Sequence, residues 1–387
     1  MHRALRRLAA LLVLAIPISF IGSARATWGP AARLPPRLPR SFETPDLIVE
    51  AAAGERTESA VVLVVLDGVR WQEFFGGSDR ALAHERGMNP LTYAGPRALL
   101  PNVAHALDER AVAIGGPHGP AISATGPQFI SMPGYLEIFA GRPDPACETN
   151  ECARPPGNTL VDELLESGGA DDGQAAVVAS WPSIARAAAA DPSRVVLSAG
   201  RHRTEREEVL RADAATAALL DKGSRSTAFP GEGDYRPDAI TARLALRVLA
   251  TDRPRFLFVG LGDADEYGHR NDYRGYLEAV HASDAFLGDL FSTLDGMGER
   301  GRHTTVLVTA DHGRSYGFKD HGARYPESGR VWLLAAGGDV HGHGLVTASR
   351  RHTLSDVAPT VLALLGVHAE GDPIPEIAPT AGARPGP

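Results

Sequence analysis

The sequence has no excess of positive charge and very little cysteine, and each of these shortages argues against a class of binding site. It carries 39 lysines and arginines against 47 aspartates and glutamates, and no segment gathers the basic residues into a stripe. Proteins that bind a nucleic-acid backbone depend on such a stripe, so the sequence argues against this class. The two cysteines are by themselves a poor metal site.

There is no internal repeat, and only the N-terminus contains an apolar run that resembles a membrane segment. That run, residues 8–21, is short for a bilayer span, follows a basic start and precedes the small-residue pattern Ala24-Arg25-Ala26. These features predict a signal peptide over residues 1–26 that is cut after Ala26, with an uncleaved anchor as the alternative. The cleavage site has no cysteine, which argues against a lipid anchor. Cleavage removes four arginines and no acids, so the net charge changes from -8 to -12.

We therefore expect a periplasmic or secreted protein without a stable membrane span in its mature chain. In an oxidising compartment the pair Cys147 and Cys152, in "CETNEC", can close a small disulfide loop, and two free thiols are the alternative. Residues 27–57 are predicted to be a proline-rich linker and residues 369–387 a tail. The folded catalytic domain is then expected over residues 58–368.

Short apolar runs alternate with helical patterns along this domain. Runs that are apolar throughout indicate strands buried on both faces, as in a parallel sheet covered by helices. The alternation predicts a doubly wound, mostly parallel α/β fold with helices on both faces. The predicted strands are 60–68, 111–116, 175–180, 194–200, 255–265, 304–313 and 330–338, and the clearest helices are 158–169, 276–298 and 354–367.

Three of the predicted strands end in acids, namely Asp67, Asp263 or Asp265, and Asp311. Ligands of such folds bind at the carboxyl ends of the strands, so these carboxylates should meet at one edge of the sheet. Like charges repel in a low-dielectric site unless a cation joins them, and full solvent exposure is the alternative. His312 follows Asp311, and His269 follows Asp265 at the i+4 position. Aspartate and histidine together suit zinc or manganese.

As a set, the motifs resemble the alkaline phosphatase superfamily, in particular its nucleotide pyrophosphatase/phosphodiesterase (type I phosphodiesterase) and sulfatase-like branches. "VVLDGVRW" resembles the first metal-binding Asp motif, and "SMPGYLEIFAGR" resembles the nucleophile segment. "DADEYGH" and "TADHG" resemble the two Asp/His metal motifs, and "KDHGARYPESGRVWLLAAG" resembles the last His-Gly motif with its strand. The match covers about residues 60–367 in the expected order.

The resemblance implies two divalent metal ions, usually zinc, with manganese as the alternative. One would be held by Asp67, Ser131, Asp311 and His312 and the other by Asp265, His269 and His321. Ser131 would be the nucleophile that forms a phospho-serine intermediate. Asn150 is expected to hydrogen-bond a phosphate oxygen, by analogy with an asparagine downstream of the nucleophile in the phosphodiesterases.

Several assignments have rivals in the sequence. Ser123 and Thr125 are substitutes for Ser131, and Asp263 competes with Asp265. His341 and His343 compete with His321. Arg142 and Lys319 are further candidates for contact with a substrate anion. The residue after Gly134 is Tyr135, where the sulfatase signature has arginine, so conversion of Ser131 to formylglycine is not expected.

The segment between the motifs, about residues 143–254, is expected to contain two strands, a helix and a small inserted lid that selects the substrate. It is small for the large inserted domain of the phosphoglycerate mutase branch. The predicted function is an exported two-metal hydrolase of small phosphate esters, either a phosphodiesterase or a phosphomonoesterase. The alternatives are a phospho-group transferase of the same superfamily and a non-catalytic metal- or phosphate-binding protein.

Overall fold

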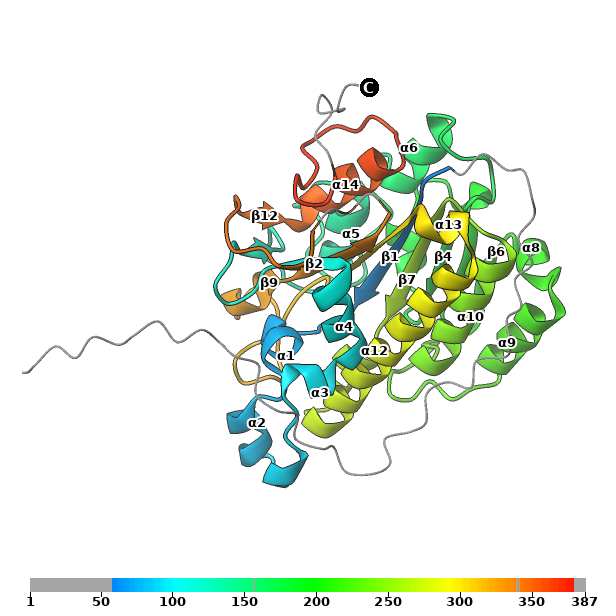
Figure 1. Cartoon of the computed structure of the whole chain (residues 1–387). Coiled ribbons are helices and arrows are strands. Elements are labelled where there is room, and N and C mark those ends of the chain that lie inside the picture. Colours follow the sequence, from blue (N-terminus) through cyan, green and yellow to red (C-terminus); the bar gives the residue numbers. More distant parts are fainter. Residues whose placement is uncertain (1–57, 156, 339, 341, 379–387) are drawn as a thin grey trace, which may run out of the picture. The chain divides into compact units, whose positions relative to one another are not determined.

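The computed structural model describes residues 58–155, 157–338, 340 and 342–378. The predicted signal peptide and linker, and residues 379–387 of the predicted tail, lie outside these residues. Figure 1 shows a central sheet with helices packed around it. None of the helices in the described part of the chain is long and apolar enough to span a lipid bilayer.

The sheet is mixed and mostly parallel, as predicted. Its strands are, in spatial order, β11 (Gly344–Leu345), β2 (Ala111–Ile114), β10 (Leu333–Gly337), β8 (Thr304–Thr309), β1 (Ala60–Leu66), β7 (Phe256–Leu261), β4 (Ala175–Ala179), β5 (Val196–Ala199) and β6 (Arg203–Glu205). β10 runs antiparallel to β8 and β2, and β6 runs antiparallel to β5. Every residue of the three central strands β8, β1 and β7 is buried, which is why these segments read as continuous apolar runs.

Helices cover both faces of the sheet (Figure 1). On one face lie α4 (Pro101–Glu109), α10 (Asp238–Thr251) and α12 (Tyr273–Gly296), and on the other lie α5 (Ser131–Ala140), α6 (Leu160–Glu166) and α14 (Val357–Leu364). Two of the predicted helices begin with a capping box, Thr159 with Asp162 before α6 and Thr353 with Asp356 before α14. The predicted helix 276–298 begins three residues earlier, because the side chain of Asp272 accepts a hydrogen bond from the Gly275 N–H and caps the first turn.

The remaining elements are short. They are the helices α1 (Trp71–Gly76), α2 (Arg80–Glu85), α3 (Pro96–Leu99), α7 (Ile184–Ala187), α8 (Glu207–Arg211), α9 (Ala214–Ser224), α11 (Asp263–His269) and α13 (Glu299–Arg302) and the 3-10 turns at Pro90–Thr92, Pro192–Arg194, Pro326–Gly329 and Leu354–Asp356. A second sheet is formed by β12 (His352–Thr353), β3 (Ile122–Ser123) and β9 (Arg330–Val331).

One predicted strand is too long. The segment 255–265 leaves the sheet at Leu261, and Asp263 begins α11. The first turn of α11 carries Asp263, Asp265 and Glu266, and acids are favourable at this position because of the partial positive charge at a helix N-terminus. As a consequence Asp265 and His269 lie on the same face of a helix.

The segment 143–254 is largely part of the main sheet. It supplies β4, β5 and β6, and its charged stretch 201–226 forms β6, α8 and α9. α9 packs against α10, and α8 packs against β5. A role for this stretch as a lid stays a prediction.

Glu137 joins three parts of the fold that meet beside the start of α5. Its carboxylate accepts hydrogen bonds from the N–H and hydroxyl of Thr125, at 2.9 and 2.6 Å, and from the N–H and hydroxyl of Ser355, at 3.1 and 2.8 Å. Only 2% of Glu137 is exposed. A single buried carboxylate therefore holds the loop that precedes α5 and the turn that precedes α14.

We expect Glu137→Ala to lower the free energy of unfolding by about 3 kcal/mol, because it leaves four donors without their acceptor. Urea unfolding measures the change. Glu148→Ala is the control, because Glu148 is exposed and its loss should change stability by less than about 0.5 kcal/mol. Equal stability of the two variants would contradict this role for Glu137.

Candidate metal centre

The three central strands bring the predicted ligands to one edge of the sheet. β8, β1 and β7 are neighbours in space. Asp67 follows β1 directly, and Asp311 and His312 follow β8 after one intervening residue. Asp265 and His269 lie on α11, which begins two residues after β7. The ligand-type side chains thus converge although they are up to 245 residues apart in sequence.

Asp67, Asp311 and His312 form the first cluster, and the structure places their ligand atoms within 4.8 Å of one another. His312 Nε2 lies 3.5 Å from Asp67 Oδ1 and 3.5 Å from Asp311 Oδ2. Both carboxylate oxygens are buried, and neither has a hydrogen-bond partner among the described residues. Buried polar atoms are rarely left without a partner, so these two oxygens indicate a position for a ligand.

The other atoms of the first cluster are held by protein groups. Tyr135 donates its hydroxyl to Asp67 Oδ2 at 3.0 Å, and the Gly68 N–H donates to Asp311 Oδ1 at 3.2 Å. His312 Nδ1 lies 2.8 Å from the carbonyl oxygen of Gly313, which can only accept, so Nδ1 carries the proton. His312 Nε2 therefore presents its lone pair to the cluster, as metal-binding histidines do.

Ser131, the predicted nucleophile, is the first residue of α5 and lies next to the first cluster. Its Oγ lies 3.3 Å from His312 Nε2. α5 can approach so closely because Gly134 faces the carbonyl of Asp311, where a Cβ would lie 2.4 Å from that oxygen. The structure thus brings Ser131 together with Asp67, Asp311 and His312.

Electrostatics in this cluster favour a cation. Burial, and then the charge of the neighbouring Asp311, raise the pKa of Asp67 well above its usual value. Burial, and then Asp265, raise the pKa of Asp311 in the same way. Burial also holds the pKa of His312 well below its ordinary value, so that the imidazole is neutral. Two carboxylates that resist ionisation beside a neutral imidazole fit a divalent cation, which would supply the missing positive charge.

Asp265, His269 and His321 form the second cluster. His269 Nε2 lies 2.9 Å from Asp265 Oδ2 and 3.2 Å from His321 Nε2. His321 Nδ1 lies 3.1 Å from the carbonyl oxygen of Phe129, which again leaves Nε2 with its lone pair toward the cluster. The rings of His312 and His321 stack with their centroids 4.0 Å apart, so the two clusters are neighbours and touch through these two rings. The nitrogen and oxygen donors of both clusters fit zinc or manganese.

Arg314 is a charged member of the site that the sequence reasoning did not single out. Its guanidinium is buried, pairs with Asp265 Oδ1 and also donates to the carbonyl oxygens of Phe318 and Lys319. Burial alone would raise the pKa of Asp265, but Arg314 and then His269 hold it well below the usual range. One oxygen of Asp265 is thus taken by Arg314, and the other faces His269.

The competing residues lie elsewhere. Asp263 accepts hydrogen bonds from Tyr235 and from the Asp238 N–H and is not in either cluster. His343 is exposed near the start of β8, at the opposite end of that strand from Asp311, and His341 lies outside the described residues. Ser123 is in β3, and Thr125 is bound to Glu137.

Asn150 lies beside the start of α5, and its predicted contact with a phosphate oxygen stays a prediction. Its side-chain Oδ1 accepts a hydrogen bond from the N–H of Met132, the residue after Ser131, at 3.0 Å. The cysteines on either side of it, Cys147 and Cys152, form a disulfide. The structure thus selects the disulfide over the two free thiols.

Comparisons with known proteins show similarity over part of this chain. Residues 237–369 match the family model described as Metalloenzyme superfamily. The chain is 30% identical over 164 residues to the 2,3-bisphosphoglycerate-independent phosphoglycerate mutase of Haloarcula marismortui, an alignment that covers 38% of this chain and 30% of the mutase. It is 31% identical over 170 residues to the phosphopentomutase of Methylobacterium radiotolerans, covering 42% of this chain and 38% of that enzyme. The alignments thus span about a third of the length of these curated relatives.

Solved structures share the fold. The phosphonate monoester hydrolase of Agrobacterium radiobacter aligns with a TM-score of 0.52 at 16% identity, over 84% of this chain and 79% of that chain. The enzyme of the same name from Silicibacter pomeroyi aligns with a TM-score of 0.52 at 14% identity, over 84% of this chain and 78% of that chain. The family match over residues 237–369 and the shared fold agree with the predicted resemblance to the alkaline phosphatase superfamily.

We expect the purified protein to bind divalent metal, and a chelator to lower its melting temperature by about 5 °C or more, because a ligand that binds only the folded state stabilises it. Calorimetry with and without added zinc or manganese measures the shift. Asp311→Asn should reduce the gain from metal, whereas His343→Asn should retain it. A melting temperature that does not respond to either metal would contradict a metal centre here.

We expect Arg314→Gln to destabilise the metal-free chain by about 3–5 kcal/mol near neutral pH, because it leaves the buried Asp265 charge unpaired. Without the Arg314 guanidinium, Asp265 takes up a proton as the pH falls. The loss of stability should therefore become smaller between about pH 7.5 and about pH 5. Urea unfolding at both pH values measures it. Arg314→Lys keeps the charge and should lose less, and a loss that does not depend on pH would count against the pairing.

Proposed function

We propose that the protein is an exported two-metal hydrolase of small phosphate esters, a phosphodiesterase or a phosphomonoesterase, that acts through a phospho-serine intermediate. One observation carries the proposal. The hydroxyl of Ser131 lies at the N-terminus of α5, against a buried cluster in which Asp67 Oδ1 and Asp311 Oδ2 have no hydrogen-bond partner in the described part of the chain. A nucleophile beside a cation site at a helix N-terminus suits attack on an anionic ester.

In this proposal Asp67, Asp311, His312 and Ser131 hold one divalent ion, and Asp265, His269 and His321 hold the other. When bound, the two ions supply positive charge to the attacking and leaving oxygens and lower the pKa of a bound hydroxyl or water. Ser131 Oγ gives up its proton to water and attacks phosphorus, the bond from phosphorus to the alcohol oxygen breaks, and the departing alkoxide takes up a proton from water. Water then hydrolyses the phospho-serine and restores the serine.

The protein's own groups fix the geometry for this reaction. The carbonyls of Gly313 and Phe129 select the tautomers of His312 and His321, and Arg314 leaves only one Asp265 oxygen toward the second ion. Tyr135 occupies the position where the sulfatase signature has arginine and binds Asp67. Without the signature arginine, conversion of Ser131 to formylglycine is not expected, which favours phosphate over sulfate esters.

Several observations support the class of reaction and the compartment. The curated relatives are phosphomutases, and the structural neighbours named above are phosphonate monoester hydrolases, so phosphoryl-transfer chemistry suits this chain. The signal-like N-terminus and the Cys147–Cys152 disulfide support export to an oxidising compartment. Zinc is the metal that best fits the nitrogen-rich second cluster, and manganese is the alternative.

The match to mutases favours one second candidate, transfer of the phosphoryl group to another hydroxyl. It would use the same Ser131 intermediate with an alcohol in place of water. Product analysis with an added alcohol acceptor separates the two reactions. Free phosphate as the main product supports the hydrolase, and a new phosphate ester supports the transferase.

The decisive experiment is to measure the metal content of the mature protein together with its turnover of p-nitrophenyl phosphate, bis-p-nitrophenyl phosphate and p-nitrophenyl sulfate. We expect about two ions per chain and chelator-sensitive turnover of one of the phosphates. A folded chain that turns over none of the three after zinc and manganese are restored would overturn the proposal.

We expect Ser131→Ala to lower kcat for the responsive ester by about 1,000-fold or more, because the attacking oxygen is removed. Steady-state kinetics measures the loss, and the metal content should remain, because six protein ligands are left. Ser123→Ala is the matched control, because Ser123 lies in β3, and it should keep nearly full activity. Unchanged turnover by Ser131→Ala would show that another group is the nucleophile.

A further inference from the structure

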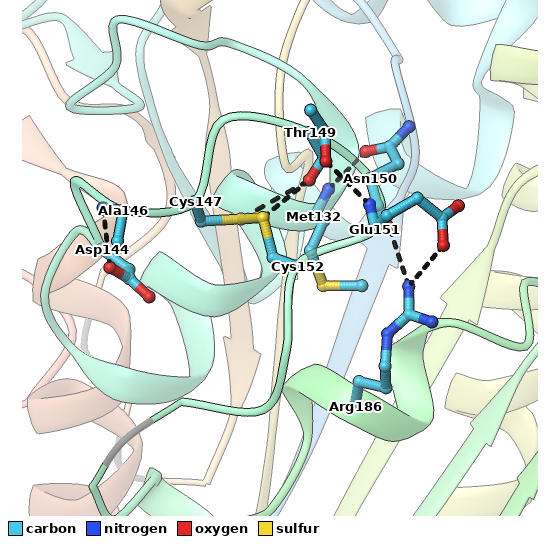
Figure 2. Close-up of a disulfide and its surroundings, with 9 residues drawn as sticks. All are labelled: Met132, Asp144, Ala146, Cys147, Thr149, Asn150, Glu151, Cys152 and Arg186. Carbon is cyan, nitrogen blue, oxygen red and sulfur yellow. Dashed lines mark hydrogen bonds and ion pairs between the residues drawn. A yellow bond between two sulfur atoms is a disulfide. The ribbon is translucent and has the colours of Figure 1, made fainter.

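The loop from Cys147 to Cys152 lies against the start of α5, so that a disulfide-closed ring borders the candidate nucleophile (Figure 2). Cys147 is buried, and its N–H donates to the carbonyl oxygen of Asp144 at 3.0 Å. In contrast, Glu148, Thr149 and Glu151 are exposed. The ring is therefore anchored at one cysteine and is mostly in solvent along the rest of its length.

Asn150 is the residue of the ring that faces α5 (Figure 2). Because the Met132 N–H can only donate, the amide oxygen of Asn150 must face it, and this decides which way the amide is turned. The Nδ2 group then points away from Met132 and has two protons to donate. The next residue of α5, Pro133, has no N–H. The amide of Asn150 thus takes the place of the Met132 N–H as a donor at this end of the helix.

Arg186 binds the main chain of Asn150. Its Nη2 donates to the carbonyl oxygen of Asn150 at 2.7 Å, and the arginine lies on α7, which packs against α5 and β5. Arg186 also lies 4.0 Å from the Glu151 carboxylate, but that side chain is 86% exposed, so the pair contributes little. Asn150 is therefore attached at its side chain by Met132, at its backbone by Arg186, and on both flanks by the disulfide.

We propose that the Cys147–Cys152 disulfide and Arg186 are positioning elements that hold the Asn150 amide where its Nδ2 donates to a phosphoryl oxygen of the bound substrate. The proposal rests on the proposed function, which places a phosphate group at Ser131. Closing the ring restricts the backbone of an exposed loop, so the amide is already oriented before the substrate binds. Arg186 stops the ring from turning as a unit about its cysteines.

A double-mutant cycle tests this arrangement. The variants are Asn150→Ala, the pair Cys147→Ser with Cys152→Ser, and all three together, in zinc-loaded protein. Two quantities are measured, the Kd for inorganic phosphate by calorimetry and kcat/KM for the responsive p-nitrophenyl ester. Asn150→Ala should weaken both about 10- to 100-fold, because a hydrogen bond to a charged group is lost. The serine pair should weaken both about 3- to 10-fold in the natural background and by less than about 2-fold when Asn150 is already alanine.

Arg186→Ala should behave like the serine pair, and Arg186→Lys should recover part of the loss, because lysine retains one donor. Arg154→Ala is the matched control. Arg154 donates to the carbonyl oxygens of Ala185 and Ala189 on the same short helix region and does not contact Asn150. It should leave phosphate binding and turnover unchanged even if it lowers the melting temperature.

The outcomes separate this inference from the proposed function. Losses from the serine pair that are equal with and without Asn150 would show that the disulfide acts only on stability, and the inference would be wrong while the hydrolase stands. Phosphate binding that follows the expected cycle without any ester turnover would uphold the inference and overturn the hydrolase. Failure of the natural protein both to bind phosphate and to turn over any of the esters would overturn both.

Discussion

The site depends on one electrostatic constraint: two carboxylate oxygens and an imidazole nitrogen face one another in a buried space, and neither oxygen has a hydrogen-bond partner among the described residues. Asp67 Oδ1 and Asp311 Oδ2 lie at equal distances from His312 Nε2, and the remaining oxygen of each acid is already bonded, to Tyr135 and to Gly68. Such a cluster is unfavourable unless positive charge enters it. The sheet order, the helix α5 and the histidine tautomers all serve to keep these atoms at that distance.

Close backbone approach makes this arrangement attainable. Gly68 has a φ of 63°, and a Cβ there would collide with Asp265, while a Cβ at Gly134 would collide with the main chain of Asp311. The glycine after the first acid lets α11 come near β1, and the glycine in α5 lets the helix lie on the turn after β8. Arg314 then compensates Asp265 on the side away from His269. A side chain at either glycine would force Asp265 or the turn after β8 to move from its position in the site.

The sequence predicts the sheet and much of the candidate site, because both leave local signals. Each of the seven predicted segments contains a strand, although residues 330–338 divide into β9 of the second sheet and β10 of the main sheet. Acids at strand ends identified Asp67 and Asp311. The predicted end of the strand at residue 265 was wrong. The acids after Gly262 begin a helix, because negative charge stabilises a helix N-terminus, and the chain therefore leaves the sheet. Tyr135 and Arg314 were missed as partners of Asp67 and Asp265 because those pairs are 68 and 49 residues apart, although Arg314 directly follows the strand-end motif. The roles of the site residues remain proposals.

The stacked rings of His312 and His321 connect the two clusters, since one ring belongs to each. If each cluster binds an ion, as proposed, a shift of either imidazole on binding would move the ring that packs against it. The affinities of the two positions would then be coupled, and linkage requires the coupling to be reciprocal: whatever the first ion does to the affinity for the second, the second does equally to the first. A chain with one ion would be a distinct species with its own affinity, and the average metal content of a preparation would not describe how its ions are distributed among the molecules.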